Sequence, residues 1–235
     1  MKTNYNNKIP NDFFNNVLKI STSTIISALV VAITLPIITK IFSASILGKY
    51  QLLISIINIF GVISCFKYEM AIVIPEKDDI ASRVLILCLL ALSSFCLILL
   101  LIFYFTSGVL LKALNAENLN DTFWVIPIGV LFFGLFEIVK YSLLRKKLFN
   151  HFSKARVYQV LSTQSLMIIF GLIKPSFISL FLAFISGHLI STMAFLKKSL
   201  MKIKPSKNIQ IFRVAKKFKK FPFFNTPMVF ANTLS

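Results

Sequence analysis

The chain has 235 residues, of which 57% are hydrophobic and only 14% are charged, and its formal net charge is +18. Soluble domains carry about 25% charged residues. The mean hydropathy of +0.81 excludes a disordered chain and argues against an ordinary soluble domain. A large positive charge is also typical of nucleic-acid-binding proteins. The positions of the 26 Lys and Arg residues therefore decide between a basic binder and a membrane protein.

Six long apolar runs without a charged residue follow one another along the chain. They are Ile20–Thr39, Tyr50–Phe66, Val84–Leu111, Thr122–Phe136, Val157–Ile173 and Pro175–Leu196. About 20 apolar residues in a helix cross the ~30 Å hydrocarbon core of a bilayer. The runs are continuous rather than alternating, which argues against membrane strands. The sequence therefore predicts an all-α integral membrane protein with six transmembrane helices. The fourth is short unless it continues past Glu137 and Lys140 to Leu144.

The cations are concentrated in alternate connections between the runs. The N-terminal segment and the connections after the second, fourth and sixth runs hold 22 of the Lys and Arg residues, and the other connections hold 4. Cytoplasmic loops carry such an excess, so the pattern predicts a cytoplasmic N-terminus. The first run is longer than the apolar core of a cleaved signal peptide, and we interpret it as a retained helix. The charge is then mainly topological, with attraction to anionic lipids rather than to nucleic acid.

The chain divides into three parts on this interpretation. Residues 1–196 form a six-helix transmembrane lobe, and residues 197–220 form a basic cytoplasmic linker. Within the linker an apolar residue recurs every three positions, at Ile209, Phe212, Ala215 and Phe218. This spacing suits a short amphipathic helix on the membrane surface, either as a linker between two lobes or as a plain juxtamembrane loop. Residues 221–235 begin a seventh helix of about 22 Å, too short to span comfortably.

Few residue patterns indicate catalysis or metal binding. Three cysteines lie in or beside apolar runs without CxxC spacing, and we interpret them as packing residues: Cys65, Cys88 and Cys96. The adjacent acids Asp78 and Asp79 are more typical of a solvated loop than of a metal site. His188 lies inside the sixth run, where a lone histidine bonds across helices or relays protons. We expect no enzyme activity, no metal and no cofactor.

Ionisable residues at membrane depth are costly and are therefore the candidates for function. Glu137 and Lys140 are three residues apart, share a helix face and can pair. They either line a polar cavity or extend to the interface. Lys19 precedes a group of hydroxyl residues that either bond their own helix or face a polar lumen. Together with Lys67 and Glu69, these residues are our candidates for a substrate cavity.

Five short motifs stand in order along the chain. They are Pro36 with Leu47-Gly48-Lys49-Tyr50, the stretch Lys67-Tyr68-Glu69-Met70-Ala71-Ile72-Val73-Ile74-Pro75, Asp79-Ile80-Ala81, Arg145-Lys146-Lys147-Leu148-Phe149, and residues 217–227. Together they resemble the polysaccharide biosynthesis (Wzx-like) flippases, in the superfamily that includes MATE exporters and the lipid II flippase. The sharpest motif is Tyr68 to Pro75. The arginine usual before its tyrosine is Lys67 here, which keeps the charge but loses bidentate geometry.

The resemblance implies a two-lobe transporter with a central cavity, of which this chain supplies the N-terminal lobe. It implies that such a protein moves undecaprenyl-diphosphate-linked oligosaccharide units across the bacterial inner membrane for O-antigen or capsule synthesis. The implied partners are that lipid-linked oligosaccharide, anionic membrane lipids, a missing C-terminal lobe and other polysaccharide-assembly membrane proteins. Three alternatives stay open: a MATE-like multidrug exporter, a membrane-embedded polysaccharide transferase and a non-transporting membrane scaffold.

Overall fold

The computed structural model describes residues 11–113, 122–199 and 211–229, and within these ranges it contains helices and no strands. In chain order the elements are α1 (Asn11–Ile41), α2 (Ala44–Ile63), α3 (Tyr68–Ala71), α4 (Asp78–Ala113), α5 (Val125–Arg145), α6 (Phe149–Ile173), α7 (Phe177–Ser199), α8 (Ile211–Lys217) and the π-helix η2 (Phe221–Asn225). Among the described residues, six helices are long and apolar enough to cross a membrane, which are α1, α2, α4, α5, α6 and α7. The prediction of an all-α multi-pass membrane protein is confirmed.

All six long helices extend beyond the apolar runs that predicted them, and α2 and α5 show why. Helix α2 begins at Ala44 rather than Tyr50, because the Ser43 hydroxyl caps its first turn by accepting from the Ile46 amide at 3.5 Å. Helix α5 continues through Glu137 and Lys140 to Arg145 and is 21 residues long. The fourth apolar run therefore belongs to a full-length span, because a helix tolerates a charged pair near its end.

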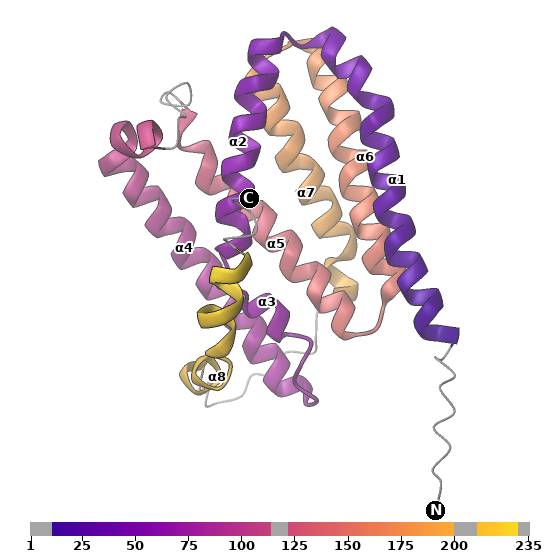
Figure 1. Cartoon of the computed structure of the whole chain (residues 1–235), viewed down its shortest axis with the longest axis vertical. Helices are drawn as coiled ribbons and strands as arrows, with labels where there is room; N and C mark the ends of the chain where they lie inside the picture. The colour runs from indigo at the N-terminus through magenta and orange to yellow at the C-terminus, as the bar shows by residue number, and fades with distance from the viewer. Residues whose placement is uncertain (1–10, 114–121, 200–210, 230–235) are drawn as a thin grey trace, which may run out of the picture.

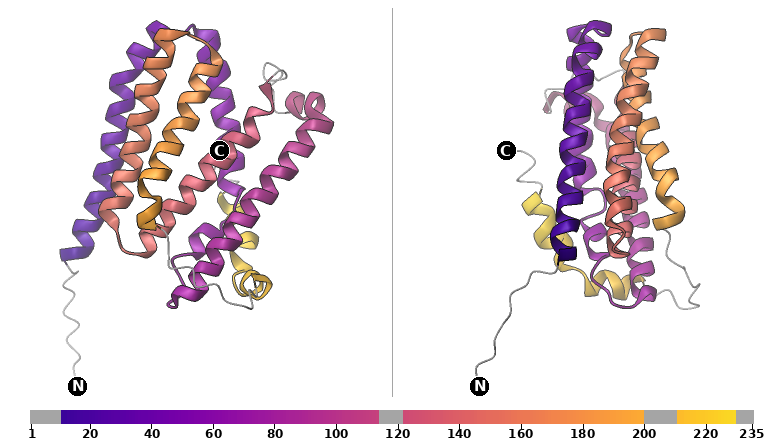
Figure 2. Two further views of the ribbon diagram at one scale, coloured as in Figure 1. Left: turned by 180° about the vertical axis from the view of Figure 1, so that it is seen from behind. Right: turned by 90° about the vertical axis from the view of Figure 1, so that its right-hand side faces the viewer.

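Successive long helices run antiparallel, so their connections alternate between two ends of the bundle (Figure 1). The start of α1, the short helix α3, the link between α5 and α6, and α8 all lie at one end (Figure 1). These are the segments predicted to be basic and cytoplasmic. Helix α6 lies between α1 and α7 (Figure 2). Helix α5 contacts α7 as well as α2 and α4. One end of the fold therefore collects most of the cations.

Small residues allow the long helices to approach closely. Gly187 of α7 faces Thr163 of α6, and a Cβ added to Gly187 would lie 2.9 Å from the Thr163 Cα atom. The Ser191 hydroxyl in α7 donates to the Ala155 carbonyl in α6 at 2.7 Å. Close backbone approach and hydroxyl bonds of this kind are the usual means of helix association in lipid. They hold α6 firmly against α7.

Helix α8 packs against the bundle with buried apolar residues and exposed lysines. Val214 and Phe218 are buried and join the main apolar core beside α4. The Tyr68 hydroxyl donates to the Ala215 carbonyl at 3.4 Å. These contacts dock α8 on the bundle, and its position on the membrane surface stays a prediction. Ile209 lies outside the described residues, and Lys216 and Lys217 remain exposed.

Candidate functional site

Lys67 and Glu69 form a buried ion pair in the turn between α2 and α4. Phe66 and Lys67 adopt positive φ values of 49° and 58°, which non-glycine residues rarely do. This turn directs the Lys67 side chain inward, where its amine lies 3.4 Å from Glu69 Oε1. The two side chains are only 9% and 5% exposed. The backbone strain is therefore coupled to a buried charge pair, an arrangement often found at functional sites.

The second carboxylate oxygen of Glu69 is unsatisfied. Glu69 Oε2 is buried and has no hydrogen-bond partner among the described residues. Burial raises the pKa of the Glu69 carboxyl above its ordinary value, Lys67 opposes this shift, and the charge of Glu137 adds to it. The Lys67 ammonium group thus offsets only part of the cost of burying the charged Glu69 carboxylate.

Glu137 and Lys140 form the predicted pair on α5. The Lys140 amine lies 2.7 Å from Glu137 Oε1, and the side chains of Lys140 and Glu137 are 16% and 24% exposed. The same amine lies over the Phe136 and Phe152 rings, at 5.2 and 6.0 Å from their centroids. Helix α5 also contacts α3. We call Lys67, Glu69, Glu137 and Lys140 the ionic cluster.

Arg145 hydrogen-bonds to the segment that follows Lys67 and Glu69. Its guanidinium donates to the carbonyls of Ile72 and Pro75, to the Glu76 carbonyl at 3.4 Å, and to Asp78 Oδ1 at 2.8 Å. The planar fork of arginine suits several acceptors at once. Sequence reasoning treated Arg145 only as a topological cation and as part of a family motif. Its four acceptors come from a segment about 70 residues earlier, so no local pattern reveals them.

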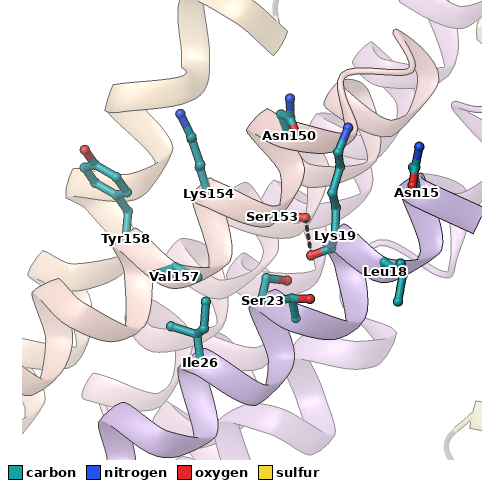
Figure 3. Close-up of a pocket in the computed structure, with 11 residues that line it drawn as sticks. Asn15, Leu18, Lys19, Ser23, Ile26, Asn150, Ser153, Lys154, Val157 and Tyr158 are labelled. Carbon is teal, nitrogen blue, oxygen red and sulfur yellow. Dashed lines mark hydrogen bonds between the residues drawn. The ribbon is translucent and has the colours of Figure 1, made fainter. Parts of the chain in front are cut away.

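Lys19 lies apart from the ionic cluster, in a groove between α1 and α6. We call this the α1–α6 groove; it has a volume of about 560 Å³ and is lined by Asn15, Leu18, Lys19, Thr22, Ser23, Ile26, Asn150, Ser153, Lys154, Val157 and Tyr158 (Figure 3). The hydroxyls of Ser23 and Thr24 both donate to the Ile20 carbonyl, at 2.7 and 3.2 Å. Ser23 and Thr24 therefore bond to their own helix, whereas Thr22 and Ser23 also line the groove and Ser27 Oγ has no hydrogen-bond partner among the described residues.

A second cavity of about 520 Å³ lies between α1, α2, α6 and α7. Three amide side chains line it, those of Gln51, Gln159 and Gln164, together with Tyr50 and apolar residues. Gln164 Oε1 accepts from the Thr34 hydroxyl at 3.0 Å, which ties α6 to α1. The interior of this membrane bundle is therefore polar in places.

His188 is buried among aromatic rings beside the second cavity. Its Nδ1 atom lies 2.9 Å from the Phe184 carbonyl and 3.5 Å from Gln159 Nε2. The Phe184 and Phe136 ring centroids are 4.3 and 5.5 Å from that of the imidazole. In the described ranges no carboxylate hydrogen-bonds to His188. A proton-relay role for this residue stays a prediction.

Residues able to ligate a metal are scattered. Within the part of the chain that the structure describes, no three His, Cys, Asp or Glu side chains come together as a potential metal site. Cys65, Cys88 and Cys96 are free and buried, and all three lie in the main apolar core. Asp78 is engaged by Arg145. The cysteines act as packing residues, as predicted.

No family model, curated protein or solved structure matches this chain.

Proposed function

We propose that this chain is one lobe of a flippase that moves undecaprenyl-diphosphate-linked oligosaccharide units from the cytoplasmic to the outer leaflet of the bacterial inner membrane. The observation that carries the proposal is the ionic cluster. Four ionisable side chains are held inside or against an apolar six-helix bundle, at the end where the basic connections gather. Such groups are expensive in a membrane protein and usually mark a translocation path.

The chemistry of the proposed substrate matches the polar groups of the lobe. A diphosphate and sugars cannot cross hydrocarbon alone, because each unsatisfied polar group costs several kcal/mol. Lys67 and Lys140 offer positive charge at the basic end, and the amides of Gln51, Gln159 and Gln164 offer hydrogen bonds deeper in the bundle. The polyprenyl tail stays in lipid. A second lobe, absent from this chain, would close the path and alternate its access.

The proposal includes an orientation and a class of partner. The N-terminus lies in the cytoplasm, because Lys and Arg concentrate at the α3 and α8 end of the bundle. The protein works without catalysis of its own, with other membrane proteins of polysaccharide assembly supplying and consuming the lipid-linked unit. The Tyr68 to Pro75 motif favours this function over drug export.

The test is a charge-neutral double substitution in the chain joined to its C-terminal lobe. Glu137→Gln with Lys140→Gln is expected to lower surface polysaccharide at least tenfold and to leave lipid-linked units on the inner leaflet. The matched control is Glu76→Gln with Lys77→Gln, which removes one exposed charge of each sign nearby. Normal export by the first variant would refute a role for the cluster. Loss of polymer without inner-leaflet accumulation would favour a transferase.

A further inference from the structure

The α1–α6 groove differs from the ionic cluster because its cations are unpaired. Lys19 and Lys154 are both exposed, and in the described parts of the chain neither forms a salt bridge. Figure 3 shows both ammonium groups directed to the same side of the groove, one from each helix. Two cations without a carboxylate leave a local positive potential that an anion can neutralise.

Helical spacing gives the groove a polar rim, and its deeper lining combines apolar residues with the hydroxyls of Thr22, Ser23 and Tyr158. Asn15 and Lys19 lie four residues apart on α1, and Asn150 and Lys154 lie four apart on α6, so each pair shares a helix face. Val157 lies about one turn deeper than Lys154, and Ile26 lies about two turns deeper than Lys19. Ile26 and Leu18 are 40% and 46% exposed. A polar rim beside an exposed apolar wall matches an amphiphile rather than a free ion.

The helices beneath the groove are fixed by short polar residues. Ser23 and Ser153 are buried, and the Ser153 hydroxyl donates to the Lys19 carbonyl at 3.0 Å (Figure 3). Because this bond joins α6 to α1 at the level of the lysines, the groove is preformed. Its shape does not depend on the flexible Lys19 and Lys154 side chains.

The groove also lies at the depth of lipid headgroups. Lys19 is two residues inside the span that begins at Val17, and Lys154 is five residues inside the span that begins at Phe149. At a rise of about 1.5 Å per residue, both are within about two turns of the membrane surface. Helix α1 stands at the edge of the bundle, on the opposite side from α4 (Figure 1).

From these observations we propose that the α1–α6 groove binds an anionic phospholipid. Lys19 and Lys154 contact the headgroup phosphate, the Asn15, Asn150 and Tyr158 polar groups bond its oxygens, and an acyl chain lies on Leu18, Ile26 and Val157. Basic pockets between helices on the cytoplasmic side are a known mode of lipid recognition. The phospholipid is favoured over the polyprenyl diphosphate because none of the four residues of the ionic cluster lines the groove.

The test is native mass spectrometry of the purified chain in uncharged detergent, titrated with phosphatidylglycerol. The double substitution Lys19→Gln with Lys154→Gln is expected to weaken binding roughly 30-fold, since each basic residue near the surface contributes roughly fivefold. The matched control is Lys216→Gln with Lys217→Gln on α8, which removes the same charge from two exposed lysines. Lys19→Arg with Lys154→Arg is expected to retain binding. Elution volume and helical circular dichroism verify that each variant is folded.

Several results would overturn the assignment. If the α8 control weakened phosphatidylglycerol binding equally, the groove lysines would contribute no more than any exposed lysine does. Equal binding of phosphatidylcholine would remove the role of the anionic headgroup. Displacement by millimolar inorganic phosphate would mean that the apolar wall contributes nothing. Preferential displacement by a polyprenyl diphosphate would make the groove part of the substrate path instead. Because none of these measurements uses polysaccharide export, they are independent of the proposed function.

Discussion

The ionic cluster and the α1–α6 groove place lysines at the same end of one bundle but give them different surroundings. Lys67 and Lys140 have carboxylate partners at 3.4 and 2.7 Å and are largely buried. Lys19 and Lys154 are exposed and form no salt bridge among the described residues. The difference teaches that lysines at one end of a bundle can either be paired with a carboxylate or be left exposed with their positive charge available to an anion.

The largest effect is expected on removing a cation from the cluster. Lys67→Met leaves Glu69 buried without its partner, and breaking such a pair costs about 3–5 kcal/mol. Unfolding in mixed detergent, followed by loss of helical circular dichroism, measures this change. Lys19→Met is the control from the groove and is expected to cost less than about 0.5 kcal/mol, since the side chain is exposed. Equal losses from the two variants would erase the distinction between the regions.

The packing between α6 and α7 keeps the two regions in their relative places. Gly187→Ala forces a methyl group against the Thr163 backbone, and we expect a loss of about 1–3 kcal/mol. Gly48→Ala is the matched control, because nothing lies within 4 Å of the added Cβ atom and alanine favours a helix. The same unfolding measurement applies. A neutral Gly187→Ala would mean that α6 can shift away from α7 at little cost.

The hydrogen bonds of Arg145 stabilise the segment that follows Lys67 and Glu69, and a substitution can test this. Arg145→Lys keeps the charge but cannot reach all four acceptors, so we expect a loss of about 1–2 kcal/mol. Hydrogen exchange is expected to accelerate in residues 72–78 and to stay unchanged along the α1–α6 groove. Uniform acceleration in both regions would instead indicate a global loss of stability.

The smallest expected effect is a pH dependence carried by Glu69. Its pKa is raised on folding, so the folded chain binds the proton more tightly than the unfolded chain does. Charged Glu69 therefore destabilises at neutral pH, and this cost is relieved as the pH falls toward the ordinary value of 4.5. Relative to Glu69→Gln, the wild-type chain is expected to gain stability on acidification. A difference that moves the other way would mean that Lys67 dominates over burial.

Some of the site was predictable because its interactions are local. The spacing of Glu137 and Lys140 on one helix predicts their pairing, and the run of residues from Lys67 to Glu69 places two opposite charges in one turn. The four contacts of Arg145, and the placement of Lys19 and Lys154 in one groove, join segments far apart in the chain. Those contacts were not predictable, because no local pattern encodes which helices become neighbours.

The sequence by itself determined the class of protein and the number of spans, because a bilayer demands long apolar helices and sorts cations by side. It also determined which connections share an end of the bundle. Only the tertiary structure decided that α8 docks on α4, that Lys19 lies apart from Lys67 and Lys140, and that Glu69 keeps an unpaired oxygen. The physical reason is that membrane insertion depends on the composition of each segment, whereas ion pairing depends on which side chains from different helices come within a few ångströms.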